Sequence, residues 1–218
     1  MGAVMLGMAA PQVQAQTADK KTAISGWVSS LQYYGNTGND FWNRSGVDIE
    51  VGGGGGITRY LSPSFDLGVY GNYETYKFVG SFNGAASNFD ARIGMIDLGL
   101  KLKMNNGKIL KEDFFLQPYL MAGPGLFIAN SEGQVRGPGL SAPTRFFQQI
   151  RRGEVFGAAG LRFRITPSLF ADLQTGYFYP FTDEVDGVVQ NDIDKRNDRF
   201  LRHQVGLTLA FGQMKDED

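Results

Sequence analysis

Four segments of this chain alternate between two kinds of residue at every second position for eleven or more residues. In the last of them, 201–211, one face carries Leu201, His203, Val205, Leu207, Leu209 and Phe211. The segments 47–57, 92–104 and 154–165 show the same period of two. Such runs are longer than the usual globular strand of about 5–6 residues. They match the roughly 9–11 residues that a tilted strand needs to cross a bilayer.

Four weaker segments, 23–34, 65–78, 114–128 and 169–180, complete the set. Segment 114–128 is apolar on both faces and contains Pro118 and Pro124, so the sequence does not fix which face points inward. Together the segments predict an all-β fold, an eight-stranded antiparallel up-and-down transmembrane β-barrel over 22–212.

The connections between these segments alternate in length along the chain. Four are long, polar and rich in Gly, Asn and Asp: 35–46, 79–90, 129–152 and 181–198. The three between them, 61–64, 105–107 and 166–168, are short. Outer-membrane barrels have short periplasmic turns and long outer loops, and an even strand number leaves both barrel ends in the periplasm. The alternative, a soluble sandwich or lipocalin-like barrel, has no reason for this alternation.

The N-terminus predicts export. Met1–Ala10 is apolar but too short to cross a bilayer, and a small-residue cleavage pattern follows at 13–15. We interpret 1–16 as a signal peptide cut after Ala15 or Gln16, whose basic opening region we expect upstream of Met1. The alternative is a short buried helix. Downstream there is no run of eighteen apolar residues, so an outer-membrane location follows if the strands cross the membrane.

Composition excludes several classes of function. The net charge of −1 gives no electrostatic basis for a nucleic-acid partner. The absence of cysteine removes disulfides, thiolate metal sites and a lipoprotein anchor. Thirty glycines and 13% aromatic residues suit a strand-rich barrel. We expect no cofactor.

Aromatic residues gather near the ends of the predicted strands. One group lies toward the long connections and comprises Tyr33, Tyr34, Phe41, Trp42, Tyr76, Phe78, Tyr177, Phe178, Tyr179 and Phe181. The other lies toward the short connections and comprises Tyr60, Phe65, Phe163 and Phe211. This distribution predicts two girdles at the headgroup levels of a bilayer.

Charged residues occupy the face opposite the apolar one. The predicted lumen set is Asp48, Glu50, Glu74, Asp97, Lys101, Lys103, Glu154, Arg162, Arg164, Asp172 and Arg202. Eight strands enclose a space barely wide enough for side chains, and an isolated buried ion costs several kcal/mol. We therefore expect a packed network of both signs that plugs the barrel. The alternative is an ion path through the lumen.

Catalysis is not predicted. His203 is the only histidine, and the next residue on its face is Val205, where a lipid deacylase would need a serine. The acidic residues between 183 and 198 are balanced by Lys195, Arg196 and Arg199, as in a solvated loop. With no second histidine and no thiol, we expect no metal site.

The last strand carries a recognisable motif. Gln204, Gly206, Leu209 and Phe211 are similar to the signal read by the outer-membrane assembly machinery: polar, any, Gly, any two, hydrophobic, any, aromatic. The whole of 22–212 resembles the N-terminal barrel of OmpA-family proteins, in the form common among Bacteroidota. The resemblance implies an outer-membrane location, contacts with membrane lipid and lipopolysaccharide, and insertion by the assembly machinery.

The resemblance also bears on the charged tail, 213–218. In the family the barrel ends with Phe-Gly, followed by a Lys-Asp-x-Asp segment that opens an acidic, calcium-binding linker and a peptidoglycan-binding domain. Here Phe211, Gly212, Lys215, Asp216 and Asp218 match that pattern. Two interpretations stay open: the start of a periplasmic linker in a longer protein, or a plain charged terminus.

Three functions follow from these patterns. The first is a structural outer-membrane protein that displays four loops and tethers the membrane to peptidoglycan if a further domain exists. The second is a narrow porin or ion channel. The third is a surface adhesin or receptor that acts through the long loops, with a contact surface at Arg136, Arg145, Phe146, Phe147, Arg151 and Arg152. The alternative for that surface is an ordinary mobile loop.

Overall fold

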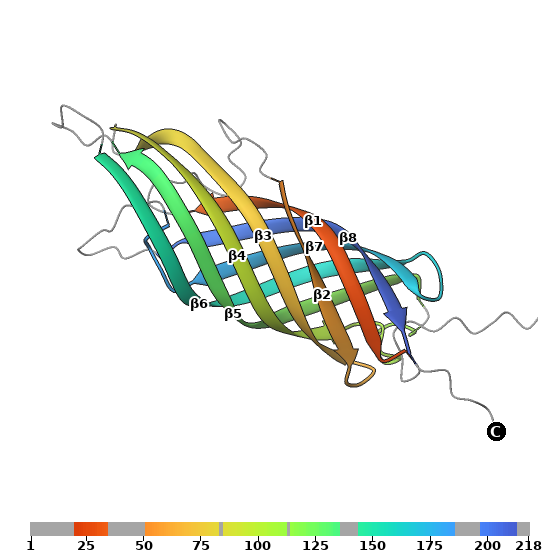
Figure 1. The fold of residues 1–218 in the computed structure, drawn as a ribbon. Helices are drawn as coiled ribbons and strands as arrows, with labels where there is room; N and C mark the ends of the chain where they lie inside the picture. Colours follow the sequence, from red (N-terminus) through yellow and green to blue (C-terminus); the bar gives the residue numbers. More distant parts are fainter. Residues whose placement is uncertain are drawn as a thin grey trace, which may run out of the picture.

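The computed structural model describes residues 20–34, 51–82, 85–112, 114–135, 144–185 and 197–212. They form eight antiparallel strands, each paired with its chain neighbours, and β8 pairs with β1 to close the barrel (Figure 1). The eight-stranded antiparallel barrel predicted from the sequence is confirmed. No helix in these ranges is long and apolar enough to cross a membrane. The strands are β1 (Thr22–Tyr34), β2 (Val51–Tyr60), β3 (Phe65–Phe82), β4 (Ala85–Lys103), β5 (Leu116–Val135), β6 (Thr144–Arg164), β7 (Leu169–Pro180) and β8 (Arg199–Phe211).

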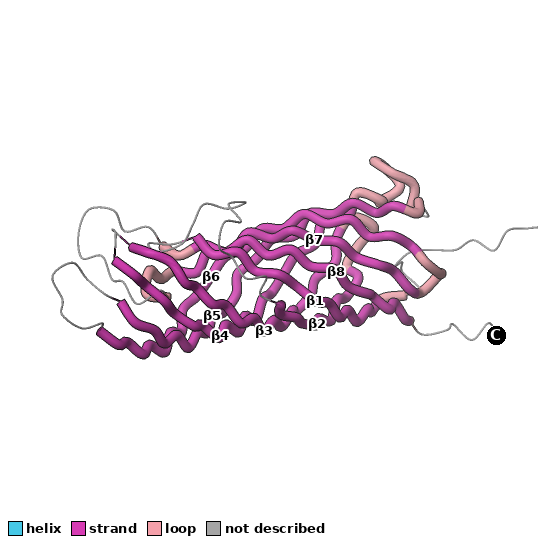
Figure 2. Tube along the Cα trace, turned by 90° about the horizontal axis from the view of Figure 1, so that it is seen from above, coloured by secondary structure: helices cyan, strands magenta, loops and turns pink. Residues whose placement is uncertain are grey.

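The two ends of the barrel differ. The three connections 61–64, 104–115 and 165–168 lie together at one end, here called the turn end (Figure 1). Strands β3 to β6 contain 18, 19, 20 and 21 residues and project at the other end, here called the extended end (Figure 2). The remaining strands contain 10 to 13 residues. The barrel wall is therefore much taller on one side.

Two of the predicted loops are wrong. Most of 79–90 belongs to β3 and β4, which pair as far as Phe82 and Ala85. Most of 129–152 likewise belongs to β5 and β6, which pair as far as Val135 and Thr144. These segments are polar because a strand outside lipid does not need an apolar outward face. Their polar composition therefore suggested loops. Ladder hydrogen bonds hold such a strand whatever its side chains are.

The other predicted segments agree with the strands to within a few residues at most ends. Residues 47–50 of the segment 47–57 lie outside the described residues, and β2 starts at Val51. In β5, the uncertain register resolves with Tyr119 and Met121 buried inside the barrel. Pro118 and Pro124 fall on the opposite, outward face by the alternation of the strand.

An apolar belt covers the outside of the wall. On β4, Ile96, Leu98 and Leu100 are 46–54% exposed although they are large and apolar. On β8, the alternate residues from Val205 to Phe211 are exposed in the same way. A soluble protein rarely exposes a contiguous patch of this extent, and lipid is the solvent that covers such a belt on a barrel.

Glycines let the barrel close around Trp27. This residue of β1 lies between Gly206 of β8 and Gly54 of β2 in the strand register. A Cβ atom at Gly206 would lie 2.7 Å from Trp27 Cβ, and one at Gly54 would lie 2.9 Å from the indole ring. Across the gap that Gly54 leaves, Trp27 Nε1 donates a hydrogen bond to Asn72 Oδ1 of β3 at 2.8 Å.

Candidate functional site in the barrel lumen

The lumen is filled by three successive groups of side chains. The first two are charged and are called the turn-end cluster (Asp66, Lys101, Lys103, Arg162 and Asp172) and the central cluster (Glu74, Asp97, Glu154 and Arg202). The third lies toward the extended end and is apolar; it is called the aromatic plug. Each group takes side chains from several strands, because alternate residues of every strand point into a barrel.

The turn-end cluster contains two ion pairs. Arg162 Nε donates to Asp172 Oδ1 at 2.8 Å across β6 and β7. The second oxygen of Asp172 accepts a hydrogen bond from Thr208 Oγ1 at 2.6 Å. Lys103 Nζ donates to Asp66 Oδ1 at 2.7 Å across β3 and β4. These pairs supply the direct, hydrogen-bonded geometry that a buried charge requires.

Aromatic rings lie against both lysines of this cluster. Lys101 Nζ lies 4.4 Å from the centroid of the Tyr119 ring, and Tyr119 donates its hydroxyl hydrogen bond to Gln174 Oε1 at 3.0 Å. The Lys103 ammonium is also 4.4 Å from the Tyr60 ring centroid. A desolvated cation over a ring is stabilised by about 2 kcal/mol. A cavity of about 20 Å³ remains here, beside Tyr70 and Arg162, which is room for one water molecule.

The central cluster holds three carboxyl groups and one guanidinium, all nearly inaccessible to solvent. Glu74 Oε1 accepts a hydrogen bond from Ser29 Oγ at 2.6 Å. Arg202 lies 4.1 Å from the centroid of the Phe178 ring and interacts electrostatically with all three carboxylates. Carboxyl groups therefore outnumber basic groups at this level of the lumen, whereas basic groups outnumber carboxyl groups in the turn-end cluster.

Gly125 creates the space in which two of these carboxyl groups meet. Asp97, Gly125 and Glu154 lie side by side in the register of β4, β5 and β6. A Cβ atom at Gly125 would lie 2.2 Å from Asp97 Oδ1 and 3.1 Å from Glu154 Oε1. Both carboxyl groups therefore reach over the glycine, and any side chain there would displace them.

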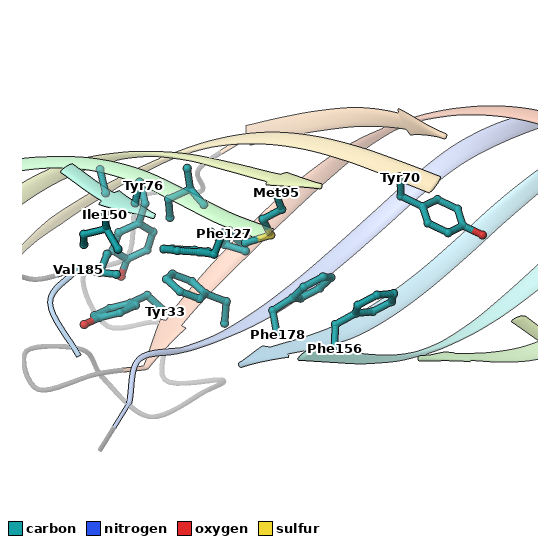
Figure 3. Packing of buried hydrophobic residues seen from close by; sticks show 14 of the residues in the cluster. Tyr33, Tyr70, Tyr76, Met95, Phe127, Ile150, Phe156, Phe178 and Val185 are labelled. Atoms are coloured by element: carbon teal, nitrogen blue, oxygen red, sulfur yellow. The ribbon is translucent and has the colours of Figure 1, made fainter. Parts of the chain in front are cut away.

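The aromatic plug closes the lumen toward the extended end (Figure 3). The rings of Tyr33, Tyr76, Phe89 and Phe200 pack with centroids 5.3–5.8 Å apart, the usual range for aromatic pairs. Phe127 stacks on Phe200 at 5.5 Å. No member is more than 4% exposed; the plug comprises Leu31, Tyr33, Tyr76, Phe89, Ile93, Phe127, Ile150, Phe178, Val185 and Phe200.

The segment 181–185, which follows β7, covers the plug toward the extended end. Val185 is fully buried within it, although this residue belongs to no strand. Its backbone N–H donates to Asp198 Oδ2 at 2.9 Å, and the Tyr33 hydroxyl donates to Asp198 Oδ1 at 2.5 Å. Asp198 thus ties the segment to β1, and the described part of the lumen is packed from the turn end to the extended end.

The structure locates nine of the eleven residues predicted for the lumen. Glu74, Asp97, Lys101, Lys103, Glu154, Arg162, Asp172 and Arg202 form the two charged clusters, and Arg164 shares the face of Arg162 at the turn end. Asp48 and Glu50 lie outside the described residues. The prediction omitted Asp66, which is fully buried. Its position between Phe65 and Leu67, both of which face outward, was the signal that could have identified it.

The predicted aromatic girdles are wrong for several residues. Tyr33, Tyr76 and Phe178 belong to the plug, and Tyr60 lies over Lys103 inside the barrel. Phe65, Tyr177, Phe181 and Phe211 are exposed on the outside, as a girdle requires. Clustering near strand ends could not separate the two faces, because aromatic residues fill a barrel lumen as readily as they line its outer surface.

The other predicted sites fall on strands. Gln204, Gly206, Leu209 and Phe211 lie on β8, where Leu209 and Phe211 face outward. Of the proposed contact surface, Arg136 lies outside the described residues. Arg145, Phe146, Phe147, Arg151 and Arg152 are on β6 and not on a loop; Phe146 packs against the plug, and Arg152 pairs with Glu184 at 3.5 Å.

His203 faces outward on β8. Its Nδ1 lies 3.0 Å from the hydroxyl oxygen of Thr175 on β7, which is a hydrogen bond. Within the described ranges, no three His, Asp or Glu side chains are grouped closely enough to hold a metal ion. This contact accounts for the Nδ1 atom of an outward-facing side chain.

Comparison with known proteins supports the fold. No protein-family model and no curated protein matches the chain. The solved structure of Neisserial surface protein A matches with a TM-score of 0.57 and 13% identity, over 87% of this chain and 97% of that one. The outer membrane protein OprG of Pseudomonas aeruginosa matches at 0.56 and 11%, over 91% and 99%. Ail, the attachment invasion locus protein of Yersinia pestis, solved with the heparin analogue sucrose octasulfate, matches at 0.51 and 11%, over 88% and 99%. The chain therefore shares the closed-barrel fold of bacterial outer-membrane proteins.

Proposed function

We propose that this protein is a structural outer-membrane barrel of the OmpA type: the belt anchors it, the closed lumen makes it rigid, and the extended end is displayed outside the cell. The observation that carries the proposal is the continuous packing of the lumen among the residues that the structure describes. Two charged clusters and the aromatic plug occupy it in succession, and the cavity between Tyr70 and Arg162 holds about 20 Å³. A barrel filled in this way serves as an anchor.

The orientation and partners follow from the same proposal. Outer-membrane barrels place their short turns in the periplasm, so the turn end faces inward and β3 to β6 project from the cell. Lipid and lipopolysaccharide surround the belt, and the assembly machinery inserts the chain through Gln204, Gly206, Leu209 and Phe211 of β8. The segment 1–16 acts as a cleaved signal peptide. If the protein has a peptidoglycan-binding domain, the tail 213–218 would open the linker to it.

Conductance across planar bilayers tests the closed lumen. The purified, refolded protein is expected to give no single-channel steps. A matched variant, Phe89→Ala/Phe127→Ala/Phe200→Ala, removes three rings of the aromatic plug and is expected to increase ion leakage. Reproducible steps from the unaltered protein would contradict the proposal and favour a narrow channel.

A surface receptor is the second candidate, and one observation favours it. Arg145 and Arg151 are exposed on the same face of β6, toward the extended end. The similar barrel Ail was solved with a heparin analogue, so a sulfated polysaccharide is the natural probe. Binding that is lost in Arg145→Gln/Arg151→Gln would support the receptor, and equal binding by variant and unaltered protein would exclude it.

A further inference from the structure

The outer wall changes character above the apolar belt. Tyr73, Gly94 and Ile128 form its last apolar row across β3, β4 and β5. The next outward row across the same strands is Thr75, Arg92 and Asn130, and it continues to Gln149 on β6. The row beyond that is Lys77, Asp90, Glu132 and Phe147. A polar face thus begins where lipid ends.

These two rows surround a groove of about 380 Å³ on the outside of the wall. Its lining includes Lys77, Asp90, Arg92, Asn130, Glu132 and Phe147. A volume in this range is typical of small-ligand sites, which begin at about 300 Å³. Four hydrogen-bonded strands hold the lining in register, so the groove exists before any ligand arrives.

The lining combines charges of both signs with an exposed ring. Two cations and two carboxylates lie in this lining, so it offers both donors and acceptors of hydrogen bonds to an occupant. Phe147 is 72% exposed on a strand, so a large apolar surface stands in water beside these polar groups. Sugars match this combination, because their hydroxyls both donate to carboxylates and accept from Lys and Arg. Their apolar ring faces pack on aromatic side chains.

The position of the groove on the wall indicates which molecule would supply the sugar. Most of its lining belongs to the two outward rows directly above the belt, so the groove lies on the outer side of the wall. In the proposed orientation, the molecules beside the wall at this height are the saccharide headgroups of outer-leaflet glycolipids. We propose that this groove binds the oligosaccharide headgroup of such a glycolipid. The source of the sugar rests on the proposed function, whereas the chemistry of the groove does not.

Direct binding to the full chain in detergent micelles tests the proposal. The probes are a deacylated lipopolysaccharide core oligosaccharide, lipid A without the core, and inorganic phosphate. Phe147→Ala and Arg92→Gln are each expected to weaken core-oligosaccharide binding by about tenfold. The matched controls Phe115→Ala and Arg59→Gln remove an exposed ring and an exposed guanidinium elsewhere and are expected to change it by less than twofold.

Three outcomes would overturn the proposal. They are no binding of the core oligosaccharide, equal binding by all four variants, and binding of lipid A or phosphate alone. All variants alter exposed residues, and the shift in gel mobility between heated and unheated samples verifies that each is folded. The binding assay does not depend on conductance. If the barrel conducts ions, the proposed function is refuted, but the binding data still show whether the groove takes the oligosaccharide.

Discussion

Small residues determine which large ones the lumen can hold. Trp27 spans from Gly206 to Gly54, and the carboxyl groups of Asp97 and Glu154 meet over Gly125. Each glycine removes a side chain where a neighbour on the next strand needs the space. The thirty glycines of the chain are in part a consequence of this narrow lumen.

Replacing a lumen glycine is expected to destabilise the barrel. In Gly54→Ala the new Cβ would lie 2.2 Å from the backbone oxygen of Gly71, which cannot move without disturbing the β2–β3 ladder. Overpacking of this kind costs about 1–3 kcal/mol. The control, Gly71→Ala, places its methyl group where nothing lies within 4 Å. Urea unfolding in lipid vesicles, followed by tryptophan fluorescence, measures both; equal stability of the two variants would contradict the packing described.

The central cluster makes an asymmetric prediction. Arg202→Gln leaves Glu74, Asp97 and Glu154 facing one another without a cation and is expected to cost on the order of 3 kcal/mol. Glu154→Gln removes one of the two carboxylates that meet over Gly125 and is expected to leave stability unchanged or raised. The same unfolding assay in lipid vesicles compares them. A larger loss of stability in Glu154→Gln than in Arg202→Gln would contradict the role of Arg202 as the cation that offsets these three carboxyl groups.

At the scale of elements, the sequence predicted strands well inside the belt and poorly beyond it. The alternation in β4 and β8 exists because one face meets lipid and the other meets the lumen. Above Gly94 the outward face meets water, so Arg92 and Asp90 replace leucine and the apolar signal ends while the strand continues. Hydropathy does not report the backbone hydrogen bonds between β3 and β4, so it could not show that these strands continue above the belt.

The upper part of the β3–β4 hairpin is expected to be dispensable for folding. Replacing residues 80–87 with Asn-Gly joins Val79 to Asn88, which are paired partners, through a two-residue turn. The belt needs only about 9–11 residues per strand, so the shortened chain still spans the bilayer. Gel mobility before and after heating reports the folded barrel. Loss of the unheated, faster form would show that the extension contributes to folding.

At the scale of the whole molecule, the sequence predicted the charged part of the lumen more readily than its apolar part. Alternation along each strand identified residues such as Glu154 and Arg162. In a barrel, a charged residue on the face opposite the lipid-facing residues must point into the lumen. Alternation did not identify the plug. Phe127 and Phe200 are apolar, as lipid-facing residues also are, and only the closed register shows that they point inward.

The depth profile of outward residues along β4 tests most directly whether the belt lies in lipid and the extended end in water. The chain contains no cysteine, so single cysteines can carry a spin label without any background. In lipid vesicles, labels at residues 96, 98 and 100 are expected to collide with oxygen dissolved in lipid and to be shielded from a water-soluble nickel chelate. Labels at residues 88, 90 and 92 are expected to show the reverse, with the change near Gly94. Nickel access throughout, or burial of residues 88–92 in lipid, would contradict a barrel that the belt holds in the membrane with its extended end in water.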